Sequence, residues 1–221
     1  MPLDPSDREV EALWLAVADS GARSLAIVAA HPGEGTTSLA EALTRRAALG
    51  GRRALYVDLS GGHAAAGLGL APDAILPGER DGIGVLAYPS DATALAWRDP
   101  ARLVAQALAW RDDWDIVVFD TAPLLAEGGH GVPPASVAAA AEATILLVLA
   151  GRTAAADVRE ARQRLDRARA RLIGTVLNDR ENPSLLAEME REVGRLDRLA
   201  PGLARRIKGG LRRSSLLAQR S

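Results

Sequence analysis

The chain has 221 residues, enough for one domain with a substantial hydrophobic core, and a formal net charge of −1 at pH 7. A charge this close to zero gives no indication of nucleic-acid binding, and the absence of cysteine excludes disulfides and thiolate metal sites. No apolar run reaches the ~20 residues of a membrane span, and the polar N-terminus does not resemble a signal peptide, so we expect a soluble cytoplasmic protein.

Apolar runs alternate with helical patterns along the chain, which is typical of parallel βαβ units. The runs are continuously apolar, as expected for strands that are covered on both faces. We therefore predict an α/β domain over residues 1–202, with a doubly wound, mainly parallel sheet flanked by helices. Residues 60–84, rich in glycine and alanine, are expected to form loop and short helical pieces. The predicted strands are 24–29, 54–58, 83–88, 115–120, 144–150 and 172–178, and the predicted helices are 7–18, 37–49, 100–110, 134–141, 154–170 and 184–199.

A Gly-rich turn links the first predicted strand to the following helix, which is the context that a P-loop requires. Gly33 and Gly35 permit backbone conformations that direct successive N–H groups at one anion, and the helix N-terminus adds partial positive charge. In a P-loop, a lysine after the final glycine reaches the β- and γ-phosphates, and the next residue, Ser or Thr, binds Mg²⁺. Here these positions are Thr36 and Thr37, and the single lysine of the chain is Lys208. The alternative is an ordinary glycine turn with Thr37 as helix N-cap.

Polar residues close several predicted strands. Asp120, followed by Thr121-Ala122-Pro123, can hold a metal-bound water at the sheet edge, or begin a turn. Asp58 has the same two interpretations. Asn178 closes the last strand, where its amide can contact a base edge or start a turn. The three histidines show no ligand spacing, and we expect them in exposed loops; they are His31, His63 and His130.

The tail from residue 203 to 221 carries six basic residues and no acid, with five apolar residues between them. It fits either an amphipathic segment that contacts anionic lipid or a partner, or a solvated chain end. The basic residues are Arg205, Arg206, Lys208, Arg212, Arg213 and Arg220, and the apolar ones are Leu203, Ile207, Leu211, Leu216 and Leu217.

These motifs together resemble the bacterial tyrosine kinases (BY-kinases), ParA/MinD-like P-loop proteins that accompany capsule and exopolysaccharide chain-length proteins. The resemblance covers about residues 8–182: residues 32–38 resemble the Walker A motif, 118–125 the Walker B motif, 55–60 the second Walker motif and 174–178 the Gly-x-Val-Leu-Asn strand. It implies a P-loop NTPase fold that binds ATP or ADP with Mg²⁺. The implied nucleotide contacts are Gly33, Glu34, Gly35, Thr36, Thr37, Ser38 and Asn178; Thr37, Asp58 and Asp120 would hold Mg²⁺, and Asp58 and Asp120 would be the catalytic acids if the chain is active.

The departures from the family pattern argue against kinase activity. Thr36 stands in place of the Walker A lysine, and Ser60 in place of the second acid of the Asp-x-Asp motif. The family's oligomerisation motif, Glu-x-x-Arg-x-x-Arg, maps on Glu11, Trp14 and Val17, without its arginines. The C-terminal tyrosine cluster is absent, since the only tyrosines are Tyr56 and Tyr88. Losing charge that stabilises phosphoryl transfer costs several powers of ten in rate.

We therefore expect a pseudo-kinase or weak nucleotide binder that docks on a membrane polysaccharide co-polymerase and supports exopolysaccharide export, at the inner face of the membrane, as a monomer or a homo-oligomer. One alternative is an active ATPase in which an arginine, such as Arg152, replaces the lysine. The other is an interaction protein whose loop binds nothing.

Overall fold

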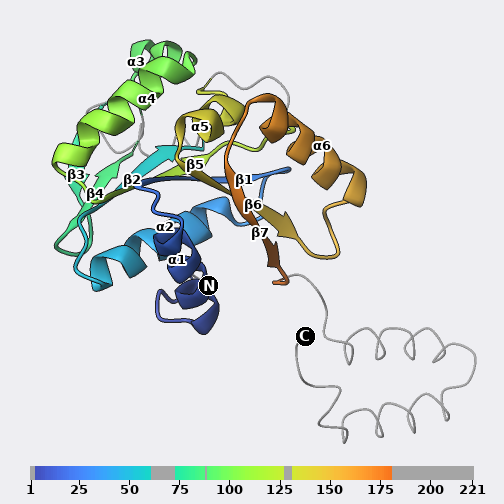
Figure 1. The fold of residues 1–221 in the computed structure, drawn as a ribbon, viewed down its shortest axis with the longest axis horizontal. Coiled ribbons are helices and arrows are strands. Elements are labelled where there is room, and N and C mark those ends of the chain that lie inside the picture. The colour runs from blue at the N-terminus through green and yellow to red at the C-terminus, as the bar shows by residue number, and fades with distance from the viewer. Residues whose placement is uncertain (1–2, 61–72, 88, 127–130, 181–221) are drawn as a thin grey trace, which may run out of the picture. The chain divides into compact units, whose positions relative to one another are not determined.

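A computed structural model of the chain describes residues 3–60, 73–87, 89–126 and 131–180 (Figure 1). The chain divides into two units, Met1–Asn178 and Asp179–Ser221, and the elements below all belong to the first. The predicted helix 184–199, the basic tail and the positions of His63, Tyr88 and His130 lie outside the described residues.

The centre of the first unit is a sheet of seven strands in the order β3-β4-β2-β5-β1-β6-β7. Every pairing is parallel except that of β3 with β4, so the predicted doubly wound, mainly parallel sheet is confirmed. Each predicted strand is found, with small shifts at its ends. The strands are β1 (Ser24–Ala29), β2 (Ala54–Leu59), β3 (Ile75–Pro77), β4 (Ile83–Leu86), β5 (Ile116–Thr121), β6 (Ala143–Leu149) and β7 (Leu172–Asn178).

Helices cover both faces of this sheet (Figure 1). α1 (Arg8–Asp19) and α2 (Thr36–Leu49) bury their apolar sides on one face, where Val17 and Leu43 are fully enclosed. The other face packs against α4 (Pro100–Ala109), α5 (Pro134–Ala140) and α6 (Ala155–Arg167). Because β1, β5 and β6 are buried along their whole length, their continuous apolar runs are explained. None of the described helices has the length and apolarity that crossing a membrane requires.

Two short elements differ from the sequence prediction. Within residues 60–84, predicted as loop and short helical pieces, β3 is a strand that pairs antiparallel with β4, and Gly78 N–H donates to the Ile83 carbonyl in the connection. A three-residue strand leaves no periodicity to detect, and its proline is tolerated because the strand lies at the sheet edge. The second is α3 (Asp91–Ala96), where the Ser90 hydroxyl accepts from Thr93 N–H as an N-cap.

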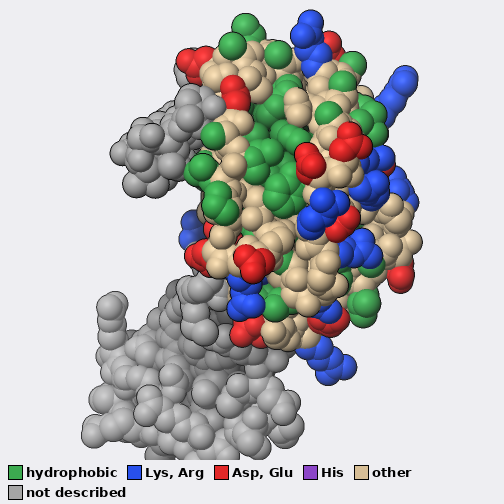
Figure 2. Space-filling view, turned by 90° about the vertical axis from the view of Figure 1, so that its left-hand side faces the viewer, with side chains coloured by type: hydrophobic (Ala, Val, Ile, Leu, Met, Phe, Trp, Pro, Cys, Tyr) green, Lys and Arg blue, Asp and Glu red, His purple; other side chains and the backbone are tan. Residues whose placement is uncertain are grey.

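Hydrophobic side chains gather on the side of the unit that carries β3, β4 and α4 (Figure 2). Ile75 on β3 is 39% exposed and Leu108 on α4 is 49% exposed. Next to β3, the ring of Trp114 lies directly on the β4 backbone, since a Cβ added to Gly84 would be 2.3 Å from the ring.

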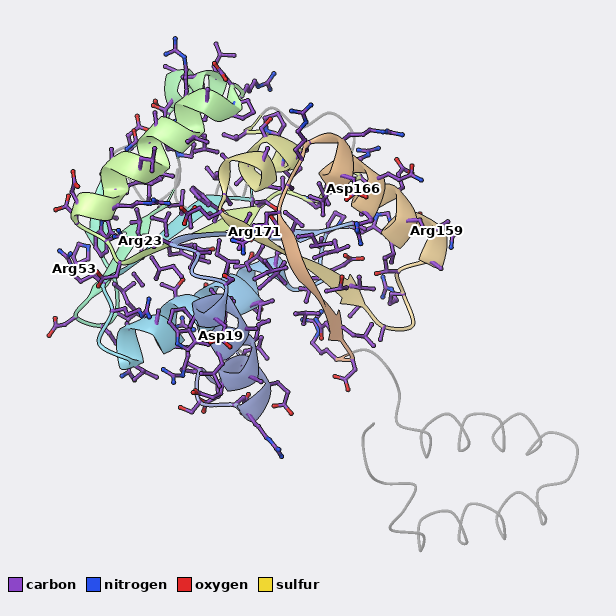
Figure 3. The ribbon with its side chains drawn as sticks, in the orientation of Figure 1. Asp19, Arg23, Arg53, Arg159, Asp166 and Arg171 are labelled. Atoms are coloured by element: carbon purple, nitrogen blue, oxygen red, sulfur yellow. The ribbon has the colours of Figure 1, made fainter. Side chains whose placement is uncertain are left out.

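Arginines link the loops at the edge of the sheet where the parallel strands begin. Arg53, Arg23 and Arg171 follow one another along this edge (Figure 3). The Arg23 guanidinium donates to the Arg111 and Trp114 carbonyls at 3.0 and 3.1 Å. Arg171 donates to the Ser20 and Glu142 carbonyls, both at 3.3 Å. This edge is occupied by structural contacts, so the opposite edge, where the parallel strands end, is the place for a ligand.

Candidate functional site

The loop between β1 and α2 lies at this carboxyl edge of the sheet. Gly33 and Gly35 have φ angles of 79° and 106°, a region that favours glycine. Gly35 occupies the N-cap position of α2, and its carbonyl accepts the Leu39 N–H at 3.0 Å. Thr37 is therefore the second residue of the helix, and the alternative in which Thr37 is the N-cap is wrong. The N–H groups of the first turn of α2, which have no intrahelical acceptors, face the loop side.

Glu34 anchors the loop from within. Its side chain is buried, with only 3% of the residue exposed. One carboxylate oxygen, Oε2, accepts the Ala30 N–H at 3.0 Å, and the other accepts the hydroxyl of Thr153 from the turn after β6. The Thr153 hydroxyl in turn accepts the Leu149 N–H at 3.1 Å. The Glu34 carboxylate thus joins the start of the loop to the turn after β6. Its role in this arrangement is to hold the loop in its conformation.

Asn178, at the end of β7, lies against the same loop. Its side-chain amide donates to the Glu34 carbonyl at 2.8 Å, and a Cβ added to Gly35 would lie 2.9 Å from the amide nitrogen. The sequence places Asn178 far from the loop, and only the order of β1, β6 and β7 brings them together. In this position Asn178 ties the end of β7 to the loop through one N–H of its side-chain amide.

Hydroxyl groups surround Asp120, which is fully buried in β5. The Thr37 hydroxyl donates to Asp120 Oδ2 at 2.6 Å, and the Tyr56 hydroxyl donates to the same oxygen at 2.9 Å. The other oxygen, Oδ1, is buried and has no hydrogen-bond partner among the described residues. Burial raises the pKa of Asp120, and the hydrogen bonds from Thr37 and Tyr56 oppose that rise. Asp120 lies within β5, so it neither begins a turn nor caps a helix.

Asp58 is the register partner of Asp120 on the neighbouring strand β2. Its Oδ1 atom accepts the Ser60 N–H at 2.9 Å and the Ser60 hydroxyl at 2.6 Å, which is the strand-end turn chemistry that was one of its two interpretations. Two facing carboxylates and a threonine hydroxyl are oxygen donors of the kind that Mg²⁺ takes. Within the described residues, however, no group of three His, Cys, Asp or Glu side chains is positioned to hold a metal ion.

Tyr56 is the residue that the sequence did not reveal at this site. It lies two positions before Asp58 on β2, so both side chains project from the same face of the strand. Burial raises the pKa of the Tyr56 hydroxyl, and the charges of Asp120 and Asp58 raise it further. The hydroxyl is therefore neutral and acts as a donor. The signal was present in the two-residue spacing, but using it requires knowing that β2 and β5 are neighbours.

Two further sequence predictions concern the surroundings of the loop. His31, predicted to be exposed, is only partly so, and its Nε2 atom pairs with Asp157 Oδ2 at 2.9 Å. The sequence could not show this pairing, because Asp157 lies on α6, 126 residues further on. Arg152 is exposed in the turn after β6, directly before Thr153.

The positions of α1 onto which the Glu-x-x-Arg-x-x-Arg motif maps face their own unit. Trp14 is 6% exposed and Val17 is fully buried in the cluster beneath α1. Glu11 accepts from Arg46 of α2, with an Nη2–Oε1 distance of 2.7 Å. These three positions therefore pack α1 against its own unit.

Neither a family model nor a curated protein sequence matches this chain. Solved structures do. The kinase domain of the Escherichia coli tyrosine kinase ETK is 23% identical, with a TM-score of 0.59 over 76% of this chain and 71% of that chain. The VpsO kinase domain is 21% identical, with a TM-score of 0.61 over 76% and 90%. Cobyrinic acid a,c-diamide synthase from Mycobacterium smegmatis, solved with an ATP analog and magnesium, is 22% identical, with a TM-score of 0.54 over 70% and 74%. The predicted fold, that of bacterial tyrosine kinase domains and related P-loop proteins, is confirmed.

Proposed function

We propose that this protein is a kinase-like P-loop protein that has lost tyrosine kinase activity and binds adenine nucleotides weakly. The observation that carries the proposal is the loop itself: two glycines with positive φ between a buried strand and the N-terminus of α2, held by the buried carboxylate of Glu34. Backbone N–H groups at such a helix start bind phosphate without any side-chain charge. The loop therefore keeps the part of phosphate binding that does not depend on lysine.

The position after Gly35 explains why the affinity is expected to be low. Thr36 begins α2, and it lies near enough to Asp120 for its hydroxyl to oppose the rise in the pKa of that carboxyl. A threonine is too short to span to a γ-phosphate and has no charge to neutralise it. ATP then gains little over ADP from its third phosphate.

ADP and ATP are accordingly expected to bind with dissociation constants within about threefold of each other, a difference under roughly 0.7 kcal/mol. Calorimetric titration of the protein with each nucleotide measures this directly. A strong preference for ATP would show that another cation, such as Arg152, replaces the lysine. Release of phosphate from ATP would then support the alternative that the protein is an active ATPase. No heat with either nucleotide would leave the interaction protein as the remaining candidate.

Tyrosine phosphorylation is expected to be absent. The Tyr56 hydroxyl is directed into the site and donates to Asp120, so it is not presented to a second molecule. Incubation with labelled ATP and Mg²⁺, followed by phosphopeptide mapping, is the measurement, with an active bacterial tyrosine kinase domain as the positive control. Stoichiometric label on Tyr56 or Tyr88 would contradict the loss of kinase activity.

We further propose that the protein acts in exopolysaccharide export by docking on the cytoplasmic face of a membrane polysaccharide co-polymerase. The likeness in fold to the kinase domains and the six basic residues of the tail support this role. A cation close to an anionic membrane surface contributes about 1 kcal/mol, screened by salt.

Removing residues 203–221 is expected to abolish most co-sedimentation with vesicles that contain phosphatidylserine at low salt. The full-length protein should lose its binding progressively as salt is raised, because the attraction is electrostatic. Neutral phosphatidylcholine vesicles are the control. If the protein with residues 203–221 and the protein without them sediment equally with anionic vesicles, the tail does not mediate membrane binding.

A further inference from the structure

The carboxylates of Asp58 and Asp120 lie where a P-loop protein holds Mg²⁺, yet hydrogen bonds within the protein already engage one oxygen of each. We propose that this site takes metal-free nucleotide, and that the hydroxyl of Tyr56 determines this by closing the position that a metal-bound water would use on Asp120. The inference rests on the proposed nucleotide binding and adds the chemical form of the ligand.

The two hydrogen bonds that Asp120 Oδ2 accepts differ in whether they are compatible with a bound metal. The Thr37 hydroxyl donates its proton to Asp120 Oδ2 and still keeps its lone pairs, so this contact alone does not prevent metal coordination by Thr37. The Tyr56 hydroxyl is different, because it brings a second donor to the same oxygen at 2.9 Å. A water on Mg²⁺ would have to donate to Asp120 in place of that phenol.

Moving Tyr56 aside to make room for such a water costs free energy. Its ring packs against the buried cluster under α2, and its hydroxyl reaches Asp120 from within the protein. Tyr56 is only partly exposed, and a hydroxyl that leaves a carboxylate gives up one of the stronger kinds of hydrogen bond. The other Asp120 oxygen is buried away from solvent, so a water on a metal at the open edge of the sheet does not reach it without a rearrangement of its surroundings.

The site also lacks the second acid of the Asp-x-Asp motif. Ser60 stands where the Walker motif expects a carboxylate, and both its N–H and its hydroxyl donate to Asp58 Oδ1. Instead of adding negative charge for a cation, Ser60 therefore uses part of the Asp58 carboxylate in a local turn. Tyr56 and Ser60, both on or next to β2, together supply hydrogen-bond donors where a metal site needs free oxygens.

Calorimetric titration with ADP tests the inference in the full-length protein, once with excess EDTA and once with excess Mg²⁺. For the wild type, Mg²⁺ should leave the affinity unchanged or weaken it, because the ion converts free ADP into its complex. For Tyr56→Phe, which removes only the hydroxyl, Mg²⁺ should tighten binding by about tenfold. Thr44→Val, which removes a buried hydroxyl two turns along α2 from Thr37, should behave like the wild type.

The outcomes separate the inference from the function on which it rests. Wild-type binding that requires Mg²⁺ would overturn the inference and leave nucleotide binding standing. Binding by wild type and Tyr56→Phe that is equally indifferent to Mg²⁺ would overturn the role of Tyr56. The absence of binding in every condition would overturn both. Melting curves of each variant show whether a loss of affinity reflects a loss of fold.

Discussion

Replacing Thr36 with lysine is expected to tighten ATP binding by about 10- to 100-fold, the effect of one charged hydrogen bond of roughly 1.5–3 kcal/mol. ADP should gain less, since the ammonium of a P-loop lysine reaches both the β- and the γ-phosphate and ADP lacks the latter. The loop around position 36 needs no rebuilding, because Gly33, Glu34 and Gly35 already have their conformations fixed. Titration calorimetry with both nucleotides gives the two affinities.

The matched control for this gain is Thr36→Met, which adds comparable length without charge. It removes the Thr36 hydroxyl from the neighbourhood of Asp120, as the lysine variant does. If Thr36→Met and Thr36→Lys bind ATP alike, charge at this position is not what the loop lacks. The same result would follow if the new ammonium paired with Asp120 instead of the phosphates, and the additional change Asp120→Asn distinguishes that case.

The sheet could be predicted from the sequence because its central strands are buried on both faces. Continuous apolar runs such as residues 144–150 are too short for a membrane span and rich in Ile, Leu and Val, which favours a strand covered on both faces. The prediction missed β3 and α3, because these elements are too short to show a periodic pattern of apolar residues. The capping serine of α3 was the one available signal, and a six-residue helix gives it little support from periodicity.

The candidate site, too, could be predicted only in part. Residues that lie next to one another in the chain, such as Gly33, Gly35 and Thr37, could be assigned to the loop from their spacing. Contacts that depend on strand order could not: Tyr56 meets Asp120 because β2 and β5 are neighbours, and Asn178 meets Glu34 from 144 residues away. The resemblance to a kinase family supplied candidates for these positions, but it did not show that Tyr56, Ser60 and Thr153 donate to the three carboxylates of the site.

These contacts give the loop its shape through hydrogen bonds within the protein. Glu34 joins Ala30 to Thr153, and Asn178 holds the carbonyl of Glu34 from the other side. Because the loop has no lysine that could bind the phosphates, its affinity for nucleotide depends more strongly on a backbone that is already held in shape. Gly35, which lies between Glu34 and the start of α2, is the position at which this arrangement is most sensitive to substitution.

Gly35→Ala is therefore expected to lower the free energy of unfolding by about 2–4 kcal/mol and to abolish nucleotide binding. The φ of 106° is one that L-residues rarely adopt, and the new Cβ would lie 2.9 Å from Asn178 Nδ2 and 3.4 Å from Leu147 Cδ2. Either the loop changes its conformation or Asn178 gives up its bond to the Glu34 carbonyl. Urea unfolding and calorimetric titration with ADP measure the two effects.

Two other glycines separate backbone strain from crowding. Gly51→Ala, at a φ of 78° with nothing within 4 Å of the added Cβ, should cost only about 1–2 kcal/mol and leave nucleotide binding intact, because residue 51 follows the far end of α2. Gly33→Ala has the same open surroundings at a φ of 79°, but it lies in the loop, so it should resemble Gly51→Ala in stability and lose part of the affinity. Equal losses of stability at Gly35 and Gly51 would mean that Asn178 moves aside without cost, and that the contact between β7 and the loop does not hold the loop in place.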